Sequence, residues 1–222
     1  MSAGTPTRGC FITVEGIDGA GKSTQVERLA ALLTTHGHRV VGTREPGATP
    51  LGRELRRMVL GRELVLTPEA ELLLFIADRV EHVATVISPA LAAGAIVLCD
   101  RFSDSTIAYQ GYGHGQDLAR VRRWDAESRP GLEPDLTVLL DCPVDLGAER
   151  RHREVDRYQV LDREFHERVR RGFLDQAAAA PTRIHVIDSS RDLALVSAEV
   201  AQVTLTWLAA HGVAPTAARA SV

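Results

Sequence analysis

Residues 16–23 read Gly16-Ile17-Asp18-Gly19-Ala20-Gly21-Lys22-Ser23. They match the phosphate-loop pattern G-x-x-x-x-G-K-[ST] at every fixed position, between an apolar run that predicts a strand and an amphipathic stretch that predicts a helix. In such a loop the backbone N–H groups surround phosphate, the lysine reaches the β- and γ-phosphates, and the serine hydroxyl ligates Mg²⁺. The sequence therefore predicts that residues 16–23 and the following Thr24 bind ATP, rather than forming a chance glycine turn.

The lysine of this loop is the only lysine in the chain. Every other residue of the combined Lys+Arg count of 26 is an arginine. A phosphate loop alone is shared by kinases, GTPase switches and mechanical ATPases. A GTPase normally reads its base with an Asn-Lys-x-Asp motif, which a chain without asparagine does not contain, and 222 residues leave little room for the further modules of a motor. These observations favour a kinase over a nucleotide-dependent switch.

Apolar runs alternate with helical patterns along the rest of the chain. The runs that predict strands are 11–15, 39–43, 96–100, 135–141 and 184–188. Helices are predicted at about 23–36, from Thr49-Pro50, from Thr67-Pro68 to about Ala93 with a break near Pro89, and from about Val144, Asp162 and Leu193. This order predicts an α/β fold of the P-loop NTPase type, with a five-stranded parallel sheet, helices on both faces and a short lid. We expect one domain over residues 10–211, with flexible tails at 1–9 and 212–222.

The composition is that of a soluble globular protein. The chain is 45% hydrophobic and 25% charged with a net charge of −3, so no basic surface field favours nucleic acid. Cys10, Cys99 and Cys142 lie in or beside apolar runs, which favours buried thiols over a disulfide or a metal site. Without a signal-peptide pattern or an unbroken run of about 18 apolar residues, we expect a cytoplasmic protein with no membrane segment.

Three further segments are more specific than the phosphate loop. They are Thr-Arg-Glu-Pro-Gly at 43–47, Leu-Phe-Ile-Ala-Asp-Arg at 74–79 and Asp-Arg-Phe-Ser-Asp-Ser-Thr-Ile-Ala-Tyr-Gln-Gly at 100–111. With residues 11–25 and the later matches at 134–141 and 156–157, they resemble the bacterial thymidylate kinase family in order and spacing, over about residues 11–208. The resemblance implies transfer of the γ-phosphoryl group of ATP to dTMP in dTTP synthesis, with Mg²⁺ as cofactor. It also implies a homodimer, for which the apolar helix at about 70–87 is a suitable interface.

The resemblance also implies an acceptor pocket. Phe75 corresponds to the aromatic residue that stacks on thymine, Arg79 lies one turn later where it reaches a base carbonyl, and Gln110 suits a pyrimidine edge. Tyr109 corresponds to the residue that packs against the deoxyribose and leaves little room for a 2′-hydroxyl. The other positions implied around the nucleotide are Ser105, Thr106, Glu45 and Arg56. By residue type alone, Phe75 is equally a core residue and Arg79 a surface arginine.

Catalytic and metal-binding positions follow from the same resemblance. Asp100 ends a predicted strand and resembles a Walker-B carboxylate, so that with Ser23 it is expected to hold Mg²⁺. Arg101 resembles the arginine that binds the acceptor phosphate, the alternative being a structural ion pair. Asp18 resembles a family carboxylate near the reacting groups, and with Lys22 and Arg101 it completes the expected catalytic set outside the lid.

The lid is expected at about 150–158. Some relatives carry an arginine inside the phosphate loop where this chain has Gly19, so the resemblance implies that a lid arginine supplies the charge, with Arg153 favoured over Arg150 and Arg151. A solvated helix end is the alternative interpretation. The chain departs from the family at 158–159, where Tyr-Gln replaces an aliphatic residue and an acid. The peptide bond before Pro46 is a candidate cis bond. The alternative activities are those of a UMP, CMP or AMP kinase.

Overall fold

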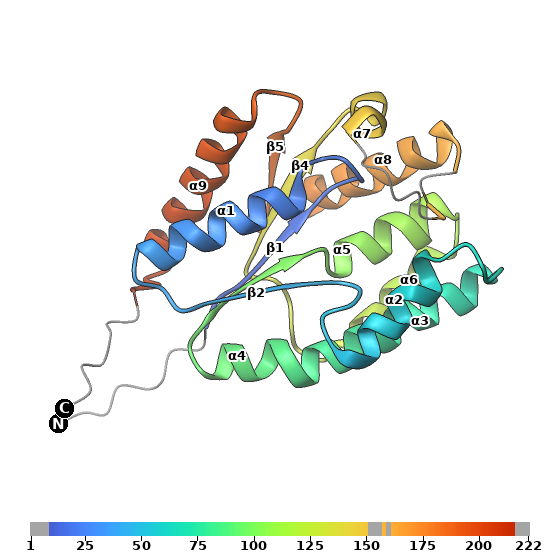
Figure 1. Cartoon of the computed structure of the whole chain (residues 1–222), viewed down its shortest axis with the longest axis horizontal. Coiled ribbons are helices and arrows are strands. Elements are labelled where there is room, and N and C mark those ends of the chain that lie inside the picture. The colour runs from blue at the N-terminus through green and yellow to red at the C-terminus, as the bar shows by residue number, and fades with distance from the viewer. Residues whose placement is uncertain (1–8, 151–156, 159–160, 216–222) are drawn as a thin grey trace.

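A computed structural model of the chain describes residues 9–150, 157–158 and 161–215. The five predicted strands form a single parallel sheet in the order β2-β3-β1-β4-β5 (Figure 1). Their bounds are β1 Phe11–Glu15, β2 Val40–Arg44, β3 Ile96–Asp100, β4 Leu136–Asp141 and β5 Ile184–Asp188. Each lies within one residue of its predicted bounds. The continuous apolar runs of β1, β3 and β4 are buried on both faces of the sheet, whereas β2 and β5 are edge strands and more exposed.

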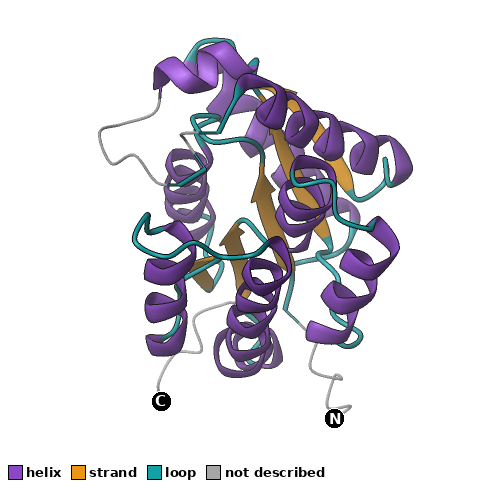
Figure 2. Ribbon diagram, turned by 90° about the vertical axis from the view of Figure 1, so that its right-hand side faces the viewer, coloured by secondary structure: helices purple, strands orange, loops and turns teal. Residues whose placement is uncertain are grey.

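Helices cover both faces of the sheet (Figure 2). The helices that the sequence predicts are α1 Lys22–Thr35, α2 Pro50–Leu60, α3 Pro68–His82, α4 Ser88–Ala92, α7 Val144–Arg150, α8 Arg163–Ala179 and α9 Leu193–Ala210. Thr49 and Thr67 cap α2 and α3 as predicted, each accepting a hydrogen bond from a backbone N–H three residues later. The predicted α/β architecture is therefore confirmed.

The core divides into two layers because the side chains of β1 alternate between the faces of the sheet. Ile12 and Val14 point into a cluster shared with α1, α8 and α9. Phe11 points the other way, where its ring lies 4.9 Å from that of Phe102 in an edge-to-face pair. The residues that cross the centre of the sheet are fully buried, so β1 is held rigidly where the phosphate loop begins.

The helical stretch after Thr67 changes from an α-helix to a π-helix shortly before Pro89. Between α3 and α4 the residues Val83–Ile87 form a π-helix, η1. Pro89 has no N–H group and its ring displaces the carbonyl of the residue four positions earlier, which is Thr85. The helix is therefore interrupted as predicted, but the irregular turn lies about one turn before Pro89.

The segment between β3 and β4 contains helices for which sequence analysis gives no bounds. They are α5 Ser103–Thr106, the π-helix η2 Ile107–Gly113 and α6 Leu118–Ser128. Nearly all of η2 is buried, so it has no amphipathic pattern from which a helix is predicted. A side chain at Gly113 would lie 2.7 Å from the ring of Phe165, so glycine here allows α8 to pack directly on η2.

Three further expectations concern the cysteines, the chain ends and membrane-spanning helices. All three cysteines are buried and none forms a disulfide, as predicted. The predicted tails 1–9 and 212–222 lie mostly outside the described residues. Among the described helices, α9 alone is long and apolar enough to cross a membrane by length and composition, with a mean hydropathy of 1.5. Val196, Val200 and Leu208 of this helix are buried in the core shared with α1, although only 22% of the helix is buried overall.

Candidate active site

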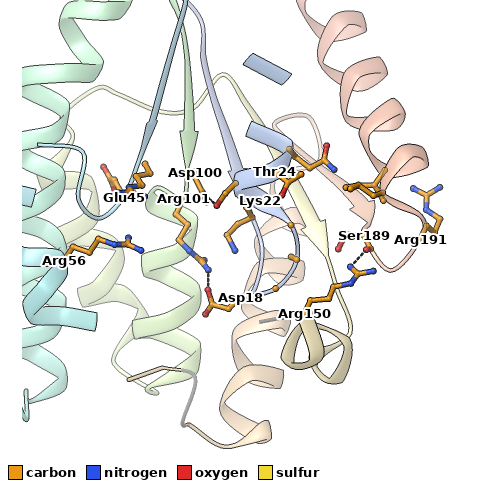
Figure 3. Close-up of a pocket in the computed structure, with 18 residues that line it drawn as sticks. Asp18, Lys22, Thr24, Glu45, Arg56, Asp100, Arg101, Arg150, Ser189 and Arg191 are labelled. Atoms are coloured by element: carbon orange, nitrogen blue, oxygen red, sulfur yellow. Dashed lines mark hydrogen bonds and ion pairs between the residues drawn. The ribbon is translucent and has the colours of Figure 1, made fainter. Parts of the chain in front are cut away.

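The carboxyl ends of β1, β2 and β3 gather most of the predicted site residues at one edge of the sheet. The phosphate loop follows β1, Glu45 follows β2, and Arg101 follows β3. Figure 3 shows Lys22 between two groups of arginines, with Arg56 and Arg101 on one side and Arg150 and Arg191 on the other. Ligands of open α/β sheets bind at this edge. A cavity of about 620 Å³ lies there and is lined by residues 18–25 of the loop.

The phosphate loop is too closely packed to carry the arginine of some relatives. Gly19 has φ 82°, a conformation that favours glycine, and a Cβ atom at this position would lie 2.1 Å from the carbonyl oxygen of Gly147 on α7. Any side chain at residue 19 would therefore displace the backbone of α7. The positive charge that the loop lacks has to come from another segment.

The side chain of Lys22, the lysine of the phosphate loop, is buried. Its Nζ donates a 2.8 Å hydrogen bond to the carbonyl oxygen of Ile17. Burial lowers the pKa of Lys22 to about 8, and the charge of Arg101 lowers it too, while Asp18 and Asp100 oppose the shift. A bound phosphate would favour the charged form further, so this ammonium group suits the binding of a polyanion.

Ser23 and Asp100 form a pair that fits a magnesium ion. The Ser23 hydroxyl donates a 2.6 Å hydrogen bond to Asp100 Oδ2, while Asp100 Oδ1 is buried without a hydrogen-bond partner. Mg²⁺ in phosphate-transfer sites takes one or two protein oxygens together with waters and substrate phosphates. The described residues contain no cluster of three or more His, Cys, Asp or Glu that would hold a metal without substrate. This oxygen pair is suited to a metal that arrives with the nucleotide.

Arg101 lies at the centre of the site in a strained conformation. Its φ is 68°, in a region that a non-glycine residue occupies at a cost of about 1–3 kcal/mol. Its guanidinium donates to Asp18 Oδ1 at 2.5 Å, to the Gly16 carbonyl at 2.9 Å and to Ser105 Oγ at 3.1 Å. Burial alone would raise the pKa of Asp18, but Arg101 and Lys22 hold it well below its usual value. The structure therefore keeps a charged ion pair between Asp18 of the phosphate loop and Arg101 after β3.

A second cavity adjoins the first on the side away from the nucleotide loop. It is smaller, about 90 Å³, and more apolar. The predicted acceptor residues that line it are Glu45, Arg56, Phe75, Arg79, Arg101, Ser105, Thr106, Tyr109 and Gln110. All the acceptor positions named from the sequence thus line one pocket. Asp18, Glu45, Arg56 and Arg101 line both cavities, so the two meet at the Asp18–Arg101 pair.

Arg79 is held by a buried ion network that sequence analysis does not predict. Its Nε and Nη2 donate to Glu45 Oε2 at 2.9 and 2.8 Å, its Nη1 donates to Asp125 Oδ1 at 2.5 Å, and Nη2 also donates to Thr106 Oγ1. His82 Nδ1 lies 2.8 Å from the other oxygen of Glu45. Of the five N–H hydrogens of a guanidinium, one on Nη1 makes no hydrogen bond to the residues that the structure describes. Glu45 thus binds Arg79 directly, besides lining the pocket.

Other buried carboxylates organise the segment around Arg101. Glu15 accepts hydrogen bonds from the Phe102 N–H at 2.7 Å and from Ser105 Oγ at 2.6 Å. Burial raises the pKa of Glu15 to about 8, and the charge of Asp104 contributes. Asp78 accepts from the Gly47 N–H, beside the Glu45–Pro46 peptide bond, which is cis as the sequence suggested. The signal for such residues was an acid at the end of an apolar strand or on the buried face of a helix.

The far end of the large cavity is lined by residues after β4 and β5. Arg150 donates a 2.7 Å hydrogen bond to the Ser189 carbonyl, and Arg191 and Leu193 lie beside it. Arg150 therefore lies at the cavity, as one of the three lid arginines named from the sequence. Arg151 and Arg153 lie outside the described residues, and so does most of the expected lid.

Comparisons with known proteins agree on one family. The family model for thymidylate kinase matches residues 14–200. Thymidylate kinase of Geobacter sulfurreducens is 47% identical over 89% of this chain and 97% of its own length, and that of Desulfovibrio desulfuricans is 50% identical over 82% and 88%. A crystal structure of thymidylate kinase from Ehrlichia chaffeensis aligns with a TM-score of 0.73 at 39% identity, covering 89% of this chain and 99% of that one.

Proposed function

The chain belongs to the thymidylate kinase family, and on this premise we propose how its residues transfer the γ-phosphoryl group of ATP to dTMP. The observation that carries the proposal is the meeting of two cavities at Asp18 and Arg101. The larger cavity is lined by the phosphate loop, and the smaller, more apolar one is lined by the residues expected to bind the acceptor nucleotide. A phosphoryl group passing between two nucleotides would cross at this pair.

Each part of the site has a separate task in this proposal. The amides of residues 16–24 and Lys22 bind the phosphates of ATP, and Arg101 exchanges part of its contact with Asp18 for the acceptor phosphate. Phe75 packs on the base, and Tyr109 lies beneath the sugar. The acceptor oxygen is already ionised, so positioning and charge neutralisation carry the catalysis rather than a strong general base.

The donor side needs further positive charge during transfer. Arg150 lines the cavity, and Arg153 is the lid residue that we propose to approach the transferring group. Closure of the lid would also exclude water, which otherwise competes as acceptor. The absence of an arginine at residue 19 supports this assignment, because the packing of Gly19 against α7 leaves the loop without its own guanidinium.

We propose that Mg²⁺ is the cofactor, held by Ser23 and Asp100 together with the ATP phosphates. When bound, the metal would neutralise charge on the β- and γ-phosphates. The pairing of the Ser23 hydroxyl with Asp100, and the buried Asp100 oxygen without a hydrogen-bond partner, support this proposal.

An acceptor panel tests the activity. We expect ADP formation from ATP and Mg²⁺ to rise strongly with dTMP, less with dUMP, and little with UMP, CMP or AMP. Chelation of the metal should abolish the reaction with every acceptor, and an otherwise identical assay with Mg²⁺ restored serves as the control. Preference for another monophosphate would overturn the base-binding assignment, while ADP release indifferent to all acceptors would point to an ATPase or switch.

We also propose a cytoplasmic homodimer that binds no nucleic acid. Leu73 and Val80 lie two turns apart on α3, and each is 50% exposed, so together they form part of an outward apolar stripe. Sedimentation should therefore give a dimer at micromolar concentration, and Leu73→Asp with Val80→Asp should give a monomer. The matched control is Leu51→Asp on α2, where the leucine is 48% exposed. A wild-type monomer would contradict the dimer.

A further inference from the structure

The carboxamide of Gln110 is oriented by two neighbours outside the phosphate site. Gln110 lines the acceptor cavity from η2 and is only 1% exposed. Its Nε2 lies 3.1 Å from Glu71 Oε1 and 3.1 Å from Tyr158 Oη. Within the described part of the chain, no hydrogen bond is made to Gln110 Oε1. The nitrogen of the carboxamide therefore faces Glu71 and Tyr158, which lie on the same side of it, and the oxygen lies on the other arm of the group.

The charge on Glu71 decides which end of the amide faces it. Burial would raise the pKa of Glu71, but the nearby His114 and the hydrogen bonds from Tyr158 and Gln110 lower it below the usual value. The Tyr158 hydroxyl donates to Glu71 Oε1 at 2.5 Å. A carboxylate only accepts hydrogen bonds, and Tyr158, having donated its hydrogen, only accepts from Gln110. The reversed orientation of the amide would place its oxygen against two acceptors.

A histidine and an arginine also lie close to the Glu71 carboxylate. His114 Nε2 lies 3.2 Å from Glu71 Oε1, and Arg157 Nη1 lies 3.6 Å from Oε2. Glu71 is buried on α3, one turn before Phe75 and two turns before Arg79, so the same helix carries the positioning group and two of the cavity residues. The orientation of Gln110 is therefore built into the folded protein rather than acquired with the ligand.

We propose that Glu71, supported by Tyr158, is a positioning residue that makes Gln110 a hydrogen-bond acceptor toward the base and so selects bases with a protonated N3. Thymine and uracil carry an N3–H donor beside the O4 acceptor, whereas the N3 of cytosine is an acceptor beside an amino group. A Gln110 oxygen that lines the same cavity as the remaining Arg79 N–H matches the first pattern and opposes the second. The inference rests on the proposed function, because it describes how the same acceptor pocket chooses its base.

The test compares kcat/KM for dTMP, dUMP and dCMP in the wild type and in Glu71→Gln. A glutamine at 71 offers either a donor or an acceptor, so Gln110 is no longer forced into one orientation. We expect the preference for dTMP over dCMP to fall at least about tenfold, which corresponds to ~1.4 kcal/mol. The values for dTMP and dUMP should change in parallel, because these acceptors share the N3–H group and differ in the 5-methyl group.

Two variants separate orientation from packing. Glu69→Gln, at an exposed position on the same helix, should leave the preference unchanged. Tyr158→Phe should raise KM for dTMP but keep the preference, since Glu71 still dictates the orientation. A Glu71→Gln variant that loses rate equally with all three acceptors would overturn the inference.

An acceptor analogue gives a readout that needs no variant. 3-Methyl-dTMP lacks the N3 hydrogen, and the wild type should use it at least about tenfold less well than dTMP, for the same loss of ~1.4 kcal/mol. Equal use of the two would overturn the proposal for Glu71 while leaving the kinase activity intact. A wild type that does not use dTMP at all would instead overturn the function on which the inference rests.

Discussion

Lys22→Ala is expected to lower kcat by at least about a hundredfold, because removal of one charged group that stabilises a transition state costs about 2.7–4 kcal/mol. The chain has no second lysine to take its place. The fold should persist, since the substitution removes a buried ammonium whose one hydrogen bond is to the Ile17 carbonyl. Steady-state turnover with saturating ATP and dTMP measures the effect, with thermal unfolding as the check on folding. Near-normal turnover would contradict the assignment of the loop.

The same residue predicts a pH dependence. With its pKa lowered to about 8 in the nucleotide-free protein, Lys22 loses its charge as the pH rises through that value. We therefore expect kcat/KM for ATP to fall above about pH 8. Lys22→Arg stays charged throughout this range, so its residual activity should lack the alkaline fall. An identical pH profile in the two proteins would show that another group titrates.

The strands and the phosphate loop could be predicted from the sequence because their signals are local. A continuous apolar run such as 96–100 identifies a buried strand, and Gly16, Lys22 and Ser23 occupy fixed positions in a short motif. The order of the strands in the sheet brings Asp18, Glu45 and Arg101 together at one edge. Most of the side chains that line the two cavities can therefore be predicted from the sequence.

What the sequence did not predict depends on contacts between distant segments. Asp125 lies on α6, a helix that the sequence analysis did not predict, and it accepts a hydrogen bond from Arg79, 46 residues earlier. Glu71 lies on α3 and Tyr158 precedes α8, 87 residues later in the sequence, yet the Tyr158 hydroxyl donates a hydrogen bond to Glu71. The signal in the sequence is weak, since an acid on a helix is ordinarily solvated. Tyr158 was noted only as a departure from the family pattern, and its hydroxyl proves to be part of the acceptor wall.

Asp125→Ala should destabilise the protein more than any surface substitution on the same helix. Asp125 is fully buried and accepts from Arg79 at 2.5 Å, from Arg129 Nε at 2.9 Å and from Ser103 Oγ at 2.8 Å. Removing one partner of a buried ion pair leaves an uncompensated charge, at a cost of about 3–5 kcal/mol. Arg79 keeps Glu45, which places the expected loss at the lower end of this range. Urea unfolding measures it.

The matched control on α6 is Glu127→Ala. Glu127 is exposed and lies 4.0 Å from the equally exposed Arg123, so its loss should change the free energy of unfolding by less than about 1 kcal/mol. Asp125→Asn keeps an acceptor for Arg79 and should lie between the two. Because Asp125 also fixes the guanidinium that faces the base, KM for dTMP should rise in the alanine variant while KM for ATP stays unchanged. An Asp125→Ala protein as stable as Glu127→Ala would show that Glu45 alone compensates Arg79.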